Sequence, residues 1–344
     1  MKTGGFRLCM AACLMATLFA ASTHADHPSM AYGEGSGGPI HTIPATTLPR
    51  GRLSLSYRFE YLNLDRLSDG RLEAAAEAGE HADSTDFVLS AFLGGAYGLA
   101  DDLTIGARIP YVFRDDIREG HLHAGEAEAE EAGSSAGHGD LMLFGQYRLL
   151  DLEERDLELA VLGGLKVPTG FKSDRTRGGE RFEVEHQPGS GSWDPIAGLA
   201  ASRRRGRLSL HGSLLYTFAT EGAQDTNLGD LLSYNLAAVY RLGGSDAHDH
   251  EGPSAADDHH HAPARLTWDL IVEANGEWRE KIDIDGGRDD DSGGHLIYAS
   301  PGIRVNLDER WSFFGSVGIP VFQDVNGNAH ETDLRLVLGV SVGF

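Results

Sequence analysis

Residues 333–344, at the end of the 344-residue chain, read DLRLVLGVSVGF. Leu334, Leu336, Leu338 and Val340 occupy every second position, while the alternate register, which begins with Asp333 and Arg335, is richer in small and polar residues. Successive side chains of a β-strand point to opposite faces of the sheet. This spacing therefore predicts a strand with one apolar face and one more polar face.

The same alternation recurs along the chain in segments that are separated by Gly-rich and Asp-rich stretches. An even number of strands, each long enough to cross a bilayer, is typical of bacterial outer-membrane barrels. The expected fold is all-β, a single antiparallel transmembrane β-barrel of about 12 strands with long outer loops and short periplasmic turns. The predicted strands are 52–64, 86–99, 103–115, 138–150, 156–168, 192–203, 207–219, 228–242, 265–279, 294–307, 311–323 and 332–344.

Alternation alone does not say which face meets lipid, because a soluble β-sandwich would bury the apolar face and expose the polar one. The membrane arrangement is favoured because the polar face carries charges together with Gly and Ser, as a wet interior would. The chain also stops at Phe344, in register with the apolar face. Aromatic residues gather near the strand ends, as in the girdles at membrane interfaces: Tyr57, Tyr61, Tyr111, Phe113, Tyr240, Trp268, Trp278 and Trp311.

The start of the chain predicts export. Lys2 and Arg7 precede an apolar run that ends in small residues, so 1–25 is expected to be a signal peptide. A lipoprotein signal at Cys13 is the alternative. We assign 26–51 as a periplasmic N-terminal extension and 52–344 as the barrel, with a His-rich periplasmic insert at 243–264.

Composition excludes several classes of function. A formal net charge of −23 argues against nucleic-acid binding, which needs basic surface to displace counterions. Both cysteines, Cys9 and Cys13, lie in the expected signal peptide. The remainder of the chain therefore has no disulfides, thiolate metal sites or cysteine nucleophiles.

Charged side chains in the polar register are candidates for the interior of the barrel. In a barrel of this size they either fill the lumen as paired networks or line a water channel, and both alternatives stay open. The candidate lumen-lining residues are Arg58, Arg108, Arg114, Arg148, Lys166, Asp194, Arg207, His211, Asp269, Glu273, Arg304 and Arg335.

Metal binding is a further alternative. Imidazoles and carboxylates bind zinc, copper or nickel, so the insert could bind transition metal weakly through His248, His250, His259, His260 and His261. No cofactor is required by this interpretation. The acidic stretches 115–131 and 283–291 resemble calcium loops in composition only, and solvated loops are the simpler interpretation.

Catalysis is not expected. A lipid-facing hydrolase needs a Ser–His pair on the outward face, with a polar group that orients the histidine. His211 lies between Ser209 and Ser213, but in the register assigned to the lumen.

Four short segments resemble the outer-membrane transporters of the meta-pathway phenol-degradation family: 37–51 (GGPIHTIPATTLPRG), 139–141 (GDL), 164–170 (GLKVPTG) and 188–195 (PGSGSWDP). The resemblance implies an outer-membrane barrel often found with aromatic-compound degradation, and it identifies no established binding residue. The His-rich insert departs from the family pattern.

Two of these segments also predict a contact. Pro168 cannot donate a ladder hydrogen bond, so its strand ends there with Lys166 pointing inward, and Asp194 begins the next strand on the lumen side. We therefore expect Lys166 and Asp194 to meet near the outer mouth.

The chain is thus expected to be a channel in the bacterial outer membrane for passive passage of small molecules. A metal-binding outer-membrane protein and a filled structural barrel are the alternatives. The expected partners are outer-membrane lipid, a small-molecule solute and the barrel assembly machinery, which would bind the strand ending at Phe344.

Overall fold

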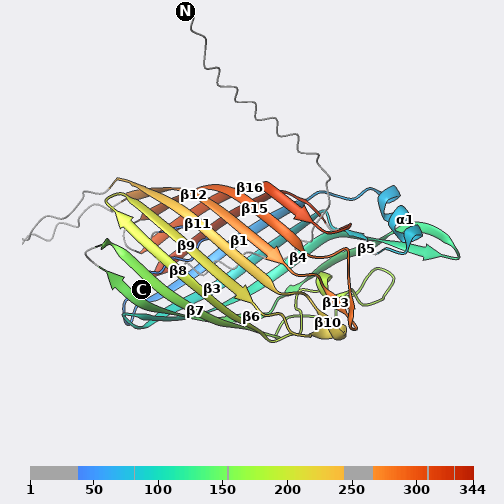
Figure 1. Ribbon diagram of the computed structural model, residues 1–344, viewed down its shortest axis with the longest axis horizontal. Helices are drawn as coiled ribbons and strands as arrows, with labels where there is room; N and C mark the ends of the chain where they lie inside the picture. Colours follow the sequence, from blue (N-terminus) through green and yellow to red (C-terminus); the bar gives the residue numbers. More distant parts are fainter. Residues whose placement is uncertain (1–37, 81, 153–154, 244–265, 308–309, 329) are drawn as a thin grey trace, which may run out of the picture.

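A computed structural model describes residues 38–80, 82–152, 155–243, 266–307, 310–328 and 330–344. Twelve antiparallel strands form a closed barrel (Figure 1). Each strand pairs with its neighbour in the chain, and β1 pairs with β17 to close the ring. The strands are β1 (Leu53–Leu64), β3 (Phe87–Ala100), β4 (Leu103–His123), β6 (Leu141–Leu152), β7 (Leu157–Val167), β8 (Asp194–Arg205), β9 (Leu208–Thr217), β11 (Leu231–Leu242), β12 (Leu266–Arg279), β15 (Gly294–Leu307), β16 (Trp311–Val325) and β17 (Thr332–Gly343).

The barrel has its apolar faces outside and its charged faces inside. On β17, Leu338 is 62% exposed whereas Arg335 is 2% exposed. On other strands, Leu236 is 66% exposed and Arg108 is 4% exposed. Such an exterior is unfavourable in water and favourable in hydrocarbon. The predicted orientation of the strands is therefore confirmed, and the barrel is an outer-membrane barrel.

The described part of the chain contains no helix that is long and apolar enough to span a membrane. Its one α-helix, α1 (Asp69–Ala78), lies beyond one end of the barrel. Gly79 ends this helix in the left-handed conformation, where its N–H caps the carbonyls of Ala75 and Ala76.

Among the connections that the structure describes, the long ones lie at one end of the barrel, which we call the loop end, and the short turns lie at the other, the turn end. Four short elements belong to the loop end: β2 (Asp83–Ser84), β10 (Thr226–Asn227), β13 (Asp283–Ile284) and β14 (Gly287–Arg288). Two 3₁₀ turns, η2 (Val184–His186) and η3 (Ala223–Asp225), lie in the same loops. This division of long and short connections matches the sequence prediction.

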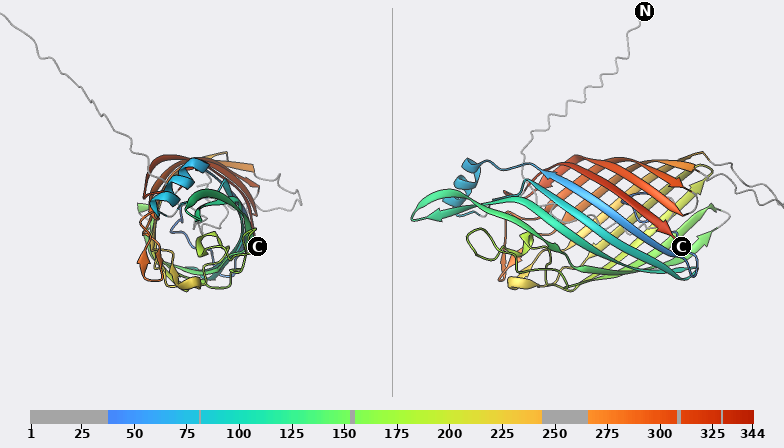
Figure 2. Two further views of the ribbon diagram at one scale, coloured as in Figure 1. Left: turned by 90° about the vertical axis from the view of Figure 1, so that its right-hand side faces the viewer. Right: turned by 180° about the vertical axis from the view of Figure 1, so that it is seen from behind.

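The connection 116–137, expected as a loop, is instead an extended hairpin. β4 continues to His123, and β5 (Glu126–His138) pairs back against it. The hairpin projects past the barrel next to α1 (Figure 2, right). Its strands carry charges such as Glu128 and Glu130 where the barrel strands carry leucine. The apolar alternation that identified the other strands is therefore missing from it.

The N-terminal extension also differs from expectation. Residues 38–48 do not hang below the barrel in the periplasm but lie inside the lumen, against inward-facing side chains. The backbone N–H of Ile43 donates to Ser213 Oγ at 3.2 Å, and that of Ala45 donates to Ser202 Oγ at 2.8 Å. We call residues 38–48 the lumen segment. Buried backbone groups need partners, and the barrel wall supplies them here.

The exposed apolar belt gives a direct test. Leu236→Arg places a charge on the outer face of β11, where hydrocarbon is expected, and should lower the free energy of unfolding by about 2–4 kcal/mol near the bilayer midplane. Urea unfolding in phospholipid vesicles measures this loss.

Leu236→Ala is the matched control, since it removes apolar surface without adding charge. If the arginine variant were as stable as the alanine variant, this face would not be in contact with lipid.

Candidate functional site in the lumen

The structure places eleven of the twelve candidate lumen-lining residues on the inner wall or at its rim. Arg207 is the exception, because it lies in the β8–β9 turn and is exposed. Its assignment to the lumen wall is therefore wrong: the strand begins one residue later, at Leu208, so the inward register does not reach it. The inward charges are mostly buried, so the interior contains packed polar networks as well as space.

One network holds the lumen segment at mid-height. The Glu273 carboxylate accepts hydrogen bonds from the backbone N–H groups of Ile40, His41 and Thr42 at 3.2, 3.0 and 2.9 Å. Arg58 donates to the carbonyl of Ile40 at 2.9 Å, and Arg304 donates to that of Pro39 at 2.9 Å. The Glu273 carboxylate thus accepts hydrogen bonds from the N–H groups of the lumen segment, while Arg58 and Arg304 donate hydrogen bonds to its carbonyl groups.

Further charges in the same region are paired, either within one strand or between neighbouring strands. Arg58 forms an ion pair with Glu60 at 3.0 Å, and Arg241 forms one with Asp269 at 2.8 Å. The guanidinium of Arg335 lies 3.9 Å from the centre of the Tyr298 ring. Pairing of this kind offsets the cost of removing charges from water.

The lumen segment continues to the turn end. Gln146 donates to the carbonyls of Pro44 and Thr46 at 2.9 and 3.1 Å, and Thr47 donates its hydroxyl to the carbonyl of Asp101. Arg148 lies beside it in an ion pair with Glu158 at 3.0 Å. The segment therefore narrows the lumen from mid-height to the turn end.

His211 faces this narrowed region. Its Nδ1 lies 2.8 Å from Ser202 Oγ, on the neighbouring strand β8. The hydrogen bond places His211 inside the barrel, in the register that the sequence predicted. It does not give the lipid-facing Ser–His pair that an outer-membrane hydrolase would need.

A pocket of about 840 Å³, including the solvent space at its mouth, lies between the lumen segment and the loop end. Its wall extends from β3 to β12, and the β7–β8 loop covers part of it through Val184, Gln187 and Pro188. The lining combines apolar side chains, such as Phe92, with four cations and two carboxylates. The charged groups are Arg108, Arg114, Lys166, Arg279, Asp140 and Asp194.

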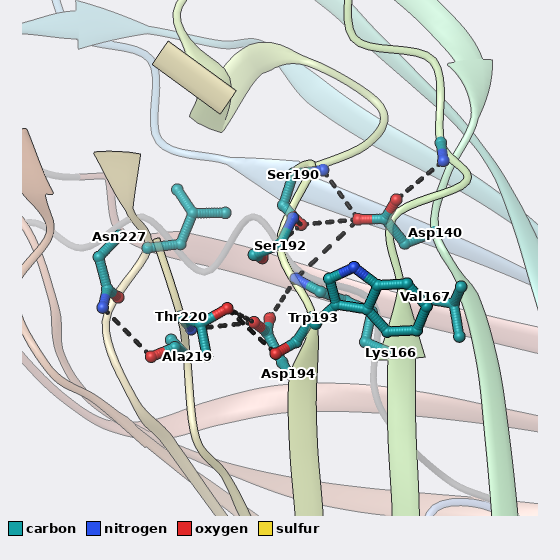
Figure 3. A network of polar contacts seen from close by, with 12 residues as sticks. Asp140, Lys166, Val167, Ser190, Ser192, Trp193, Asp194, Ala219, Thr220 and Asn227 are labelled. Carbon is teal, nitrogen blue, oxygen red and sulfur yellow. Dashed lines mark hydrogen bonds and ion pairs between the residues drawn. The ribbon is translucent and has the colours of Figure 1, made fainter. Parts of the chain in front are cut away.

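The predicted contact between Lys166 and Asp194 is present as an ion pair (Figure 3). Asp194 also accepts a hydrogen bond from the N–H of Thr220 at 3.0 Å. Neighbouring Asp140 accepts from the N–H groups of Gly170 and Ser190, both at 2.8 Å. These contacts fix both ends of the β7–β8 loop to the barrel wall.

Lys166 shares its charge with Asp194 and, at 4.0 Å, with Asp140. On the apolar side of the pocket the cation is Arg108, which contacts an aromatic ring and a thioether. Its guanidinium lies 4.7 Å from the centre of the Phe92 ring and 3.2 Å from Met142 Sδ. The pocket can therefore offer a ligand both an apolar surface and a cationic group.

Sequence patterns missed part of this site. Gln146, Arg279 and the lumen segment were not among the candidates, although 37–51 was singled out as a family segment. A signal was present in Ile40 and Ile43, two apolar residues in a stretch assigned to the aqueous periplasm.

The remaining metal-binding hypotheses have different outcomes. His248, His250, His259, His260 and His261 lie outside the described residues, so weak transition-metal binding there stays a prediction. Within the described residues, neither acidic stretch brings three ligand groups within 4.8 Å of one another.

One solved structure supports the architecture of the barrel. The outer membrane channel COG4313 from Pseudomonas putida F1 superimposes with a TM-score of 0.55 at 15% identity, over 87% of this chain and 98% of that one. A TodX deltaS2S3 mutant monoaromatic hydrocarbon channel gives a TM-score of 0.45 at 9% identity, over 86% and 91% of the two chains. No curated protein matches the sequence significantly.

The sequence also matches the profile of a protein family described as "Putative MetA-pathway of phenol degradation". The match covers residues 65–323, which is most of the chain and includes nine complete barrel strands from β3 to β15. The barrel with its apolar face outside agrees with this match, and so do the GLKVPTG and PGSGSWDP segments, which contribute Lys166 and Asp194. The chain therefore belongs to this family.

Proposed function

We propose that the barrel is a channel for the passive passage of small molecules across the outer membrane, and that it is not an enzyme. The observation that carries this proposal is the pocket inside the barrel, which is lined by inward-facing side chains of strands from β3 to β12 and by the β7–β8 loop. A barrel that served only as a structural element would have no need of such a space. A fully packed interior is the alternative, because the lumen segment is bound to the wall from mid-height to the turn end.

The solute class we propose is a small aromatic molecule with an anionic or hydrogen-bonding oxygen. Phe92, Val112 and Met142 would contact the ring, and Arg108 would bind the oxygen. A guanidinium suits this role because it binds oxygen anions and also stacks on aromatic faces. The family's description, which names phenol degradation, favours the same class.

The lumen segment would be the rate-limiting constriction. It is irregular backbone, held by side chains rather than by a sheet ladder, so one substitution in the wall can weaken its attachment. Solutes would move from the pocket past this segment to the turn end.

Glu273→Ala should increase conductance in planar bilayers. The substitution leaves buried N–H groups of the lumen segment without their acceptor, at a cost of about 1–3 kcal/mol. Single-channel recordings should show larger or more fluctuating currents than those of the unmodified barrel.

Glu277→Ala is the control, because it also removes a carboxylate from β12. The Glu277 carboxylate pairs with Arg335 and not with the lumen segment. Equal currents from both variants, or no current from any of them, would favour the filled structural barrel.

Arg108→Gln should weaken binding of small aromatic anions in the pocket. Loss of a charge-assisted hydrogen bond costs about 1.5–3 kcal/mol, so the benzoate concentration that half-blocks the current should rise about tenfold or more. Block by benzoate is compared with block by benzyl alcohol, which lacks the charge.

Arg207→Gln removes the same charge at the exposed turn-end position and should leave the block unchanged. An Arg108 variant that kept the full benzoate block would contradict the proposed role of the pocket.

We also propose that the barrel assembly machinery recognises the C-terminal strand. Phe344 extends the β1–β17 pairing, since its N–H donates to the carbonyl of Leu53 at 2.8 Å, and its ring is half exposed. Phe344→Ala should therefore lower the amount of assembled barrel in the outer membrane while leaving refolding into detergent intact. Heat-modifiable gel mobility measures both quantities, and equal losses in both would point to a purely structural role.

A further inference from the structure

Three side chains converge at the loop end, outside the pocket. Asp83 belongs to β2 in the β1–β3 loop, and Glu185 and His186 belong to η2 in the β7–β8 loop. The side chains of Asp83 and His186 are completely buried, and Glu185 is nearly so. One ligand atom of each group lies within 4.8 Å of the other two.

The distances between the three ligand atoms fit a shared metal ion better than a shared proton. His186 Nε2 lies 3.1 Å from Asp83 Oδ2 and 3.7 Å from Glu185 Oε1. A proton on Nε2 can form a good hydrogen bond with Asp83, but Glu185 is then beyond hydrogen-bond reach. A metal ion among the three atoms would contact all of them, because ligands of tetrahedral zinc at about 2.0–2.2 Å lie roughly 3.4 Å apart.

The ligand chemistry points to a class of ion. One imidazole nitrogen and two carboxylate oxygens are a usual set for zinc and related divalent transition metals, and three protein ligands leave one position for water. Burial supports the same conclusion, because two carboxylates close together out of water repel each other and are stabilised by a cation.

His330 supports the cluster without joining it. Its Nδ1 lies 3.2 Å from the carbonyl of Asp65, and its Nε2 accepts the N–H of Thr85 at 3.1 Å. The ring therefore holds the backbone beside Asp83, with its Nε2 3.9 Å from the Asp83 carboxylate. Arg114 adds a contact from the wall by donating to the carbonyls of His186 and Gln187.

We propose that Asp83, Glu185 and His186 bind a divalent transition-metal ion, with zinc as the representative ion. The ion connects two loops that are about a hundred residues apart in sequence. Gln187 and Pro188, which directly follow the ligands, line the lumen pocket. Metal binding would therefore fix the loop that covers the pocket. The site does not depend on the proposed channel function.

The test uses Zn²⁺ alone and the full chain. Its background replaces His248, His250, His259, His260 and His261 with alanine, which removes the histidines of the insert that the sequence predicted as metal ligands. Isothermal titration of the detergent-solubilised barrel should then show about one bound ion per chain. Asp83→Asn and His186→Gln should each lower the affinity for Zn²⁺ by at least about 10–100-fold. A loss of this size is expected even when a residue that only hydrogen-bonds to a metal ligand is removed.

His121→Gln is the matched control. His121 Nε2 also lies 3.0 Å from a carboxylate, that of Glu119, but on the exposed β4–β5 hairpin. This variant should bind zinc as the background does. A second readout is the Co²⁺ absorption spectrum, which should show tetrahedral bands in the background and lose them in the Asp83 and His186 variants.

Heat-modifiable gel mobility checks that each variant is folded. If Asp83→Asn does not fold, Glu185→Gln replaces it, because Glu185 lies in a loop and is not part of a strand. The proposal is wrong if the background binds no Zn²⁺, or if folded ligand variants bind Zn²⁺ as tightly as the background.

Discussion

The structure depends on the pairing of β1 with β17. A bilayer offers no water to backbone N–H and C=O groups, so a sheet can cross it only when no edge remains. The ladder from Ser54–Gly343 to Leu64–Thr332 removes the last two edges of the twelve-stranded sheet. Closure also requires every strand to present the same face outward, because a slip of one residue would turn its leucines to the lumen and its arginines to lipid.

Closure creates a second constraint inside the barrel. Side chains from twelve strands converge on a lumen that is too narrow to leave all of them in bulk water. The charges are therefore paired with one another, as Arg241 is with Asp269, or with the backbone of residues 38–48. The lumen segment, which has no sheet ladder of its own, obtains its hydrogen bonds from Glu273, Arg58 and the serine hydroxyls of the wall. Barrel and segment thus satisfy each other's polar groups.

The loop end is organised by the same need for partners. Asp140 and the Lys166–Asp194 pair attach the β7–β8 loop to the wall, and the Asp83–Glu185–His186 cluster joins it to the β1–β3 loop (Figure 3 shows the first of these attachments). The pocket lies directly beneath these attachments. Its shape is therefore set by loops as much as by strands, and loop positions can vary between family members without disturbing the barrel.

The sequence by itself determined the number of strands, their approximate ends, the outward direction of the leucines and the contact of Lys166 with Asp194. The first three features follow from the two-residue period of a β-strand, and the contact follows from the end of one strand at Pro168. Both are local properties of the chain. Strand continuation to His123 was missed because a hairpin beyond the membrane needs no apolar face. Only the tertiary structure decided that residues 38–48 enter the lumen and that Asp83 meets His186. Both depend on which distant groups lie opposite one another after the ring closes, and no periodicity in the chain records that pairing.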